Sequence, residues 1–148
     1  MSECKRIADY SRAVRTSTLK RLSRVPKGLQ NFRLQMDGAS FSEIAAHLHQ
    51  CDLWLEEKIK DPEISAITGV NELRRDYNSG EFLMLVSELE KWGDLRSELI
   101  TNIGDEKLLQ TVHDDRFGEV TYWWIVVRGN LDHEIHHRGQ LSAYLQML

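Results

Sequence analysis

The sequence predicts an all-α protein that folds as a single domain, a four-helix bundle spanning residues 1–148. Apolar residues recur every three or four positions in four long segments, which is the period of an amphipathic helix. Capping residues and helix-stopping residues separate these segments, and we find neither a convincing strand nor an internal repeat. A chain of 148 residues that is 41% hydrophobic and 28% charged has the size and composition of one globular domain. Four helices of about 20 residues bury their apolar faces by packing together, although two long connections leave the topology open.

The first predicted helix covers residues 3–25 and ends at Pro26 and Gly28. Its apolar stripe consists of Ile7, Tyr10, Val14 and Leu22. Four basic residues lie at and just beyond its C-terminal end: Lys20, Arg21, Arg24 and Lys27. They could bind an anion, but we prefer to interpret them as a solvated helix C-terminus, where positive charge is favoured.

The second predicted helix begins after Ser40, because Ser40-Phe41-Ser42-Glu43 matches the S-x-x-E capping box. It ends at Asp61-Pro62, since proline disfavours a helical conformation in the residue before it. Its buried face is expected to contain Ile44, His47, Leu48, Cys51, Trp54, Leu55 and Ile59. His49 is rotated by roughly 200° from His47 and is expected to face solvent.

The third predicted helix has Ser79 as its N-cap and continues to about residue 102. Gly93 lies inside this helix, where it costs about 1 kcal/mol relative to alanine, and it could allow a neighbouring backbone to come close. A short helical turn is predicted at residues 107–109, followed by a polar turn at residues 113–118.

Thr121 is the predicted N-cap of the last helix, which continues to Leu148. The helical period leaves two positions of its inner face ambiguous. That face consists of Trp124, Val127, Asn130 or Leu131, His133 or Glu134, His137, Leu141, Tyr144 and Leu148.

Three of the six histidines lie in the five residues His133-Glu134-Ile135-His136-His137. His133 and His137 are four positions apart, so on a helix their imidazoles can bind one metal ion. The same residues match the H-E-x-x-H pattern of zinc metalloproteases, which need a third ligand, commonly further along the chain. No His, Asp, Glu or Cys follows His137, and the position six residues beyond it is Ala143. We therefore reject a peptidase.

His47 is the best candidate for a third ligand, because it is expected on the buried face of the second helix. His47, His133 and His137 would supply three nitrogens from two helices and leave coordination positions open, as in metal sites that act on a substrate. The alternative is that each histidine is separately satisfied in the core or at the surface.

The segments Phe41–Leu48 and Leu131–Leu145 resemble the DinB-like (DinB/YfiT) superfamily of metal-binding four-helix bundles. The specific part is the C-terminal H-x-x-x-H-R-G-Q segment from His133 to Gln140. The resemblance implies that His47, His133 and His137 bind a divalent metal ion, for which zinc, nickel and iron are all plausible, and that the protein is a homodimer. It further implies a small-molecule substrate. Some members are similar to thiol S-transferases or isomerases that use a low-molecular-weight thiol such as mycothiol, bacillithiol or glutathione.

The first functional hypothesis is a metal-dependent enzyme, and its more specific form is a thiol S-transferase. An open metal position lowers the pKa of a bound thiol, which makes it a nucleophile at neutral pH. The alternative is a non-catalytic, stress-related bundle whose metal serves binding or stability.

Three residues near the histidines have open roles. Cys51 lies one turn after His47 and could be a fourth ligand, a thiol close to the substrate or a small buried hydrophobe. Glu134 could orient an imidazole or act as general base, or it could bond elsewhere. Arg138 could hold an anionic substrate or form a structural salt bridge. Glu134 and Arg138 are therefore the weak catalytic candidates.

The remaining candidates are secondary. Asn130 could line the pocket, and Gly139 is expected to allow close helix approach. His136 and His49 are not expected to be ligands, and His113 is expected in a polar loop. The four tryptophans are expected in the core or on a dimer surface: Trp54, Trp92, Trp123 and Trp124.

Charge and hydropathy exclude several partners. The net charge of −4 argues against nucleic-acid binding through general electrostatics. No apolar run approaches the roughly 18 residues of a membrane span, and the N-terminus lacks the apolar segment of a signal peptide. Cys4 and Cys51 form no disulfide framework, so we expect a cytoplasmic protein.

Overall fold

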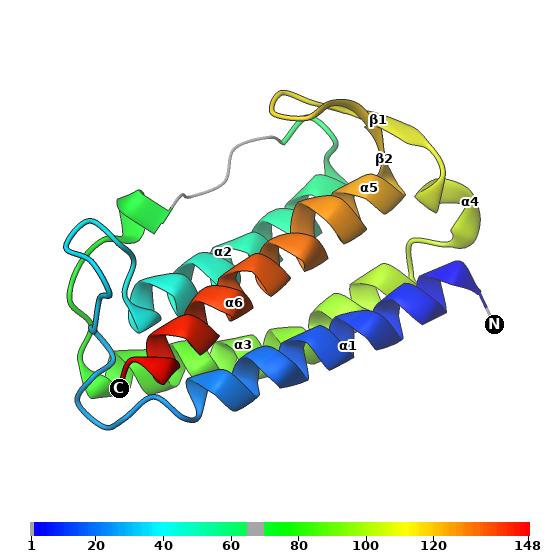
Figure 1. The fold of residues 1–148 in the computed structure, drawn as a ribbon. Helices are drawn as coiled ribbons and strands as arrows, with labels where there is room; N and C mark the ends of the chain where they lie inside the picture. Colours follow the sequence, from blue (N-terminus) through cyan, green and yellow to red (C-terminus); the bar gives the residue numbers. More distant parts are fainter. Residues whose placement is uncertain (1, 65–69) are drawn as a thin grey trace.

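The computed structural model describes residues 2–64 and 70–148 and confirms the predicted all-α bundle (Figure 1). Its long helices are α1 (Glu3–Leu22), α2 (Phe41–Lys60), α3 (Ser79–Thr101) and α6 (Asp132–Gln146). Two short segments, α5 (Tyr122–Val126) and the π-helical η2 (Val127–Leu131), lead directly into α6. The remaining elements are η1 (Val70–Leu73), α4 (Asp105–Leu108), β1 (Thr111–Asp114) and β2 (Gly118–Thr121).

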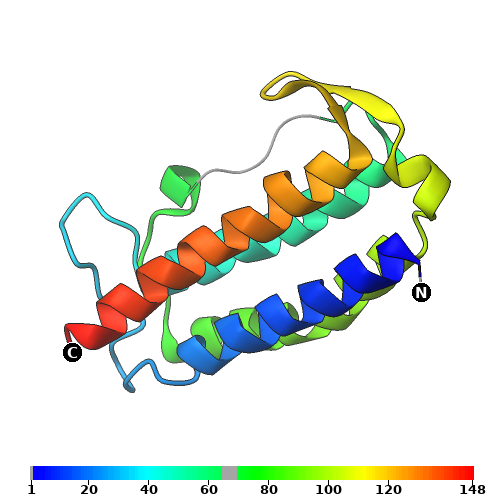
Figure 2. The same cartoon turned by 45° about the vertical axis from the view of Figure 1, so that its right-hand side comes forward.

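The helices α1 and α6 run in one direction, and α2 and α3 run in the other (Figures 1 and 2). Both α1 and α2 contact α3 and α6, so α1 and α2 occupy opposite corners of the bundle. Because α2 and α3 are parallel, the chain between them must return to the end of the bundle at which α2 begins. This connection is a crossover, a topology that the sequence analysis had left undecided.

The helix starts follow the capping signals, with one correction. Ser40 and Glu43 form both bonds of the capping box, and the Thr121 side chain accepts from the Trp124 N–H. Asn78, not Ser79, caps α3: its side chain accepts from the Glu81 N–H, and Glu81 bonds back to the Asn78 N–H. Asn is as good an N-cap as Ser, so the sequence placed this start one residue late.

The prediction that the chain contains no strand is wrong. β1 and β2 form an antiparallel hairpin in which Val112 pairs with Val120, and its turn ends at Gly118 with a φ of 77°. Each strand has only four residues, too few to show the alternation typical of a strand. The hairpin is held to α2 by the fully buried Lys58, whose ammonium donates to the His113 carbonyl and lies 3.1 Å from Asp114 Oδ2.

The last helix is not continuous as predicted, because η2 interrupts it with π-helical turns. The predicted first helix also ends earlier, at Leu22. Tyr10 lies outside the core with 48% of its surface exposed, and His49 is half-buried, with its ring centroid 6.4 Å from that of Trp92. The stripe analysis therefore misplaced Tyr10 and His49, since a helical wheel does not show which neighbouring helix covers which angle.

Two apolar clusters fill the two ends of the bundle, and charged residues lie between them. One cluster surrounds Trp54 and Ile125 near the hairpin, and the other surrounds Phe41 and Leu89 near the C-terminus. All seven residues predicted for the inner face of α2 are buried. Within residues 2–64 and 70–148, no helix combines the length and the apolar character needed to cross a lipid bilayer.

Gly93 permits a close approach, but by a side chain rather than by the neighbouring backbone that the sequence suggested. A Cβ atom at this position would lie 2.9 Å from Cγ of Arg15, well inside van der Waals contact. The glycine therefore lets α1 and α3 pack closely around a buried arginine.

Candidate metal centre

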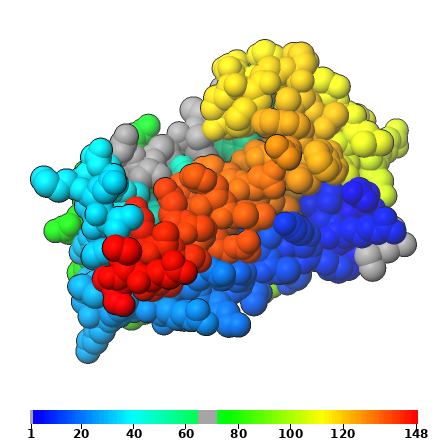
Figure 3. Space-filling model, in the orientation of Figure 1, coloured from blue at the N-terminus to red at the C-terminus, as the bar shows by residue number. Residues whose placement is uncertain are grey.

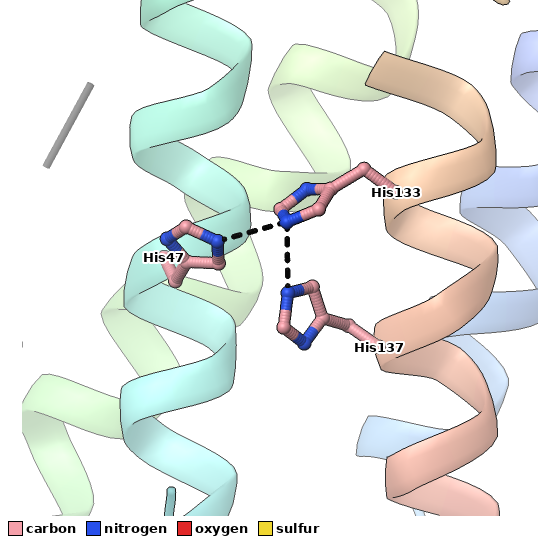
Figure 4. A group of neighbouring side chains, drawn as sticks. All are labelled: His47, His133 and His137. Atoms are coloured by element: carbon pink, nitrogen blue, oxygen red, sulfur yellow. Dashed lines mark hydrogen bonds between the residues drawn. The ribbon is translucent and has the colours of Figure 1, made fainter. Parts of the chain in front are cut away.

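Three imidazoles from α2 and α6 converge on one point (Figure 4). His133 Nε2 lies 3.2 Å from His47 Nε2 and 3.0 Å from His137 Nε2. His47 and His137 are buried, with 6% and 7% of their surfaces exposed, and His133 is half-buried. The structure thus brings together the three histidines singled out in the sequence.

The π-helical segment η2 ends immediately before the two histidines of α6. A π turn adds a residue to the helical repeat, and such bulges are frequent at functional sites. Here it resolves the ambiguous inner face: Asn130 and Leu131 are both buried, as are Glu134 and His137. In the α-helix that follows, adjacent residues point about 100° apart, so Glu134 lies in the bundle interior while His133 lies at the histidine cluster.

Hydrogen bonds fix the orientation of two of the rings. His137 Nδ1 lies 2.6 Å from Gln140 Oε1, and an amide oxygen can only accept, so Nδ1 carries the proton and Nε2 presents a lone pair. His133 Nδ1 lies 3.5 Å from Cys51 Sγ, on the side of the ring opposite the histidine cluster. Such outer partners are typical of metal-binding histidines, whose second nitrogen donates to a neighbouring acceptor.

The converging nitrogens fit a divalent metal ion better than they fit one another. His133 Nε2 has either one proton or one lone pair, yet it faces two other Nε2 atoms, so it can serve only one of these contacts well. Nitrogens bound at about 2.0–2.1 Å lie about 3.3–3.4 Å apart in tetrahedral geometry and about 2.8–3.0 Å apart at right angles. The observed separations of 3.0 and 3.2 Å lie between these values. An all-imidazole donor set suits zinc, iron or nickel alike.

Burial keeps the imidazoles neutral, which is the form that binds metal. Desolvation, reinforced by His47, lowers the pKa of His133 to about 4. Desolvation and the neighbouring His133 lower the pKa of His137 to about 3, against the opposing effect of the Gln140 hydrogen bond. Protons therefore compete weakly for these two nitrogens at neutral pH.

Cys51 lies beside the triad but does not belong to it. Its sulfur is 3.8 Å from His47 Nε2, and the atoms that group within 4.8 Å of one another in the described residues come from the three histidines alone. Burial, together with Asp52 and Glu134, raises the pKa of Cys51 to about 12. The residue is thus a neutral, buried thiol that contacts the imidazoles of His47 and His133.

Glu134 points away from the triad into a buried ion network. Its carboxylate accepts from Arg15, from Arg96 and from the Thr18 hydroxyl, and Asp52 is the second carboxylate of the network. Burial alone would raise the pKa of Glu134, but Arg96 and Arg15 hold it far below its ordinary value. A carboxylate engaged in this way cannot act as general base, so Glu134 is a structural residue.

The other candidates occupy different places. Asn130 is buried, donates to the Cys51 carbonyl and accepts from Arg96, so it belongs to the network rather than to a pocket wall. Arg138 is half-buried, and its side chain forms no ion pair with any residue in the described ranges 2–64 and 70–148, so the structural salt bridge considered for it is not formed there. A Cβ at Gly139 would meet nothing within 4 Å, so the close approach expected there is absent.

The remaining histidines and tryptophans lie largely where expected. His136 is exposed on α6, and His113 lies on β1, where it bonds Glu119. Trp54 and Trp92 are buried in the core, while Trp123 and Trp124 are half-buried.

Sequence reasoning missed the arginines that surround the site. Arg15 and Arg96 are 2% and 1% exposed, although arginine is rarely buried so fully. Arg116, in the hairpin turn, was read only as part of a polar loop, yet its charge acts on both His133 and Cys51. Gln140 was visible only as part of the H-R-G-Q segment.

The fold and the site together define a helical bundle with a three-histidine cluster compatible with a metal site. A sequence profile of the DinB family matches residues 1–148, and the chain therefore belongs to the DinB family. The structure is similar to the crystal structure of YjoA, a DinB-like protein from Bacillus subtilis, with a TM-score of 0.70 over 96% of this chain and 90% of that one. The two sequences are 17% identical, so this likeness shows the common fold. No functionally curated protein matches the chain.

Proposed function

We propose that this protein is a metal-dependent enzyme that binds a divalent zinc, nickel or iron ion through His47, His133 and His137. The observation that carries the proposal is the convergence of three Nε2 atoms, with no fourth protein ligand among the described residues. Three protein ligands leave room for a small molecule at the metal, as in catalytic rather than structural sites.

We further propose a thiol S-transferase that uses a low-molecular-weight thiol. When bound, the metal would act as a Lewis acid that lowers the pKa of a thiol at the open position. The only cysteine at the site supports an external thiol, because Cys51, with its pKa raised to about 12, is a poor nucleophile. In the transfer, the thiol sulfur bonds to an electrophilic carbon, the leaving group departs with its bonding electrons, and the thiol proton passes to water.

The protein's own residues hold the site in position. Gln140 and Cys51 fix the rings of His137 and His133. One residue away from His133, Glu134 ties α6 to the arginines of α1 and α3, so the rotation of α6 about its axis is set by charged contacts in the core.

One observation favours the alternative, a non-catalytic metal-binding protein. Two carboxylates flank His133 in the sequence: the ion pairs of Glu134 withdraw it from proton transfer, and Asp132 pairs with Arg128. A reaction that needs a protein general base would lack one here, whereas transfer from a metal-activated thiol does not require it.

A thiol-consumption assay separates the two functions. Protein loaded with each metal is mixed with glutathione, bacillithiol or mycothiol and an electrophile such as a haloarene. We expect turnover that a chelator abolishes, that metal restores, and that His137→Ala lacks while His136→Ala retains it. Bound metal without turnover across these thiols would favour the non-catalytic alternative.

The homodimer implied by the family resemblance remains a proposal as well. Large apolar side chains on α3, including Leu83 and Met84 with 64% and 67% of their surfaces exposed, offer apolar surface for such contact. Light scattering on the purified protein measures the mass directly, and a mass of one chain would contradict the dimer.

A further inference from the structure

The hairpin turn packs against residues that lie one helical turn from Cys51 and His133. On α2, Trp54 is one turn beyond Cys51 toward the hairpin, and on η2, Gly129 is one turn before His133. The turn touches both: Arg116 Cζ lies 4.7 Å from the centroid of Trp54, and a Cβ at Gly129 would lie 3.7 Å from the ring of Phe117. In Figures 1 and 3 the hairpin projects at this end of the bundle, beside the start of α5.

The guanidinium of Arg116 is available to a ligand. It stacks between the rings of Trp54 and Phe117, with centroid distances of 4.7 and 4.6 Å, and its side chain is 35% exposed. Its Nε lies 3.5 Å from Asp114 Oδ1, but neither terminal nitrogen donates to an acceptor in residues 2–64 and 70–148. The charge of Asp114 is itself balanced by Lys58 at 3.1 Å. The guanidinium thus keeps two terminal nitrogens that have no acceptor among the described residues.

A second donor at the same place lacks a partner. Trp54 is only 3% exposed, yet its indole N–H finds no acceptor among the described residues. A buried donor without a partner is costly, at about 1–3 kcal/mol, and such groups are uncommon in folded proteins. An acceptor from outside the chain would satisfy it.

We propose that Arg116 and the Trp54 N–H bind the carboxylate of an anionic small molecule whose other end occupies the open position at the histidine cluster. This inference rests on the proposed function and specifies its substrate class: a thiol bearing a carboxylate. A stacked guanidinium presents its planar fork to such a group, and carboxylate is the anion that this fork matches in two hydrogen bonds. Arg116 thereby takes the role that the sequence suggested for Arg138.

The test compares two thiols that differ in charge. Protein loaded with Co²⁺ is titrated with 3-mercaptopropionate and with neutral 3-mercapto-1-propanol, and binding is followed by the visible absorption of cobalt. We expect the wild type to prefer the anionic thiol, and we expect Arg116→Gln to reduce the ratio of the two affinities about tenfold. Arg24→Gln, which removes an exposed charge far from the hairpin, controls for net charge and should leave the ratio unchanged.

The outcomes separate this inference from the proposed function. If cobalt does not bind, the metal site itself fails. If cobalt and both thiols bind with a ratio that Arg116→Gln leaves unchanged, or that Arg138→Gln changes instead, the assignment to Arg116 is overturned while the proposed function stands. If cobalt binds but neither thiol does, the thiol hypothesis fails. Comparing the binding of propionate with that of propionamide then tests the anion site alone. A preference for propionate that Arg116→Gln removes supports the anion site, and any other result overturns it.

Discussion

Replacing Glu134 by glutamine should destabilise the fold strongly, because this carboxylate lies at the centre of the buried ion network. Glu134 accepts from Arg15 Nη2 at 2.8 Å and Nε at 3.1 Å, from Arg96 Nη1 at 2.6 Å, and from Thr18 Oγ1 at 2.7 Å. None of Arg15, Arg96 and Glu134 is more than 2% exposed. All four bonds are charge-assisted, the stronger class of hydrogen bond, because their acceptor is an ionised carboxylate.

The size of the effect follows from the charge balance. Two arginines face two carboxylates, Glu134 and Asp52, so the network is neutral as it stands. Glutamine preserves the shape but removes one negative charge and turns an amide N–H₂ toward a guanidinium. Removing one partner of a buried ion pair costs about 3–5 kcal/mol. That is a large part of the about 5–15 kcal/mol by which a domain of this kind is stable.

Urea unfolding of the metal-free protein at pH 7, followed by circular dichroism, measures the change. The control is Glu98→Gln, an exposed position on α3, which should alter the free energy of unfolding by less than about 0.5 kcal/mol. The pKa of Glu134 is lowered in the folded protein, so its contribution is complete above its ordinary pKa of 4.5 and is lost as the pH falls below that value. The difference between wild type and Glu134→Gln should therefore shrink below about pH 4.5. Equal stabilities of the two variants at pH 7 would refute the reasoning.

Three further predictions concern packing and metal binding. Gly93→Ala should destabilise the protein by about 1–3 kcal/mol, since its Cβ would meet Arg15 at 2.9 Å. Gly139→Ala has open space around it and should instead stabilise the protein by about 0.5–1 kcal/mol. Thermal unfolding of both variants tests whether the two effects have opposite signs. Gln140→Ala should weaken metal affinity about 10–100-fold, measured by competition with a chelating dye, and unchanged affinity would remove its orienting role. In the metal-free protein the imidazole of His137, with its pKa lowered to about 3, should stay neutral between pH 7 and pH 5 in ¹⁵N NMR spectra, and a titration midpoint near 6.5 would contradict its burial.

The sequence predicted best those features that depend on local chemistry. The capping box at Ser40 and the stripe of α2 follow from residue spacing within one helix. The pairing of His133 with His137 needs only the four-residue repeat. The addition of His47 required an inference across helices, and the family resemblance supplied its strongest support.

The features that were missed depend on tertiary contacts. The burial of charged residues such as Arg15 and Arg96 could not be predicted, because only their partners on other helices explain it. The π-helical turns of η2 leave no signal in the hydrophobic period other than an ambiguous inner face. The hairpin has two strands of four residues, and its stability comes from contacts such as that with Lys58 rather than from its own sequence.

The metal content of the purified protein tests the central claim most directly. Elemental analysis after equilibrium dialysis against Zn²⁺, Ni²⁺ or Fe²⁺ should find one ion per chain in the wild type and in His136→Ala, in which an exposed histidine of the same helix is removed. His47→Ala should lose the ion, although it changes a different helix from the one that carries His133 and His137. The three-histidine site would be contradicted if His47→Ala kept a full equivalent of metal. It would also be contradicted if the wild type bound none of the three ions.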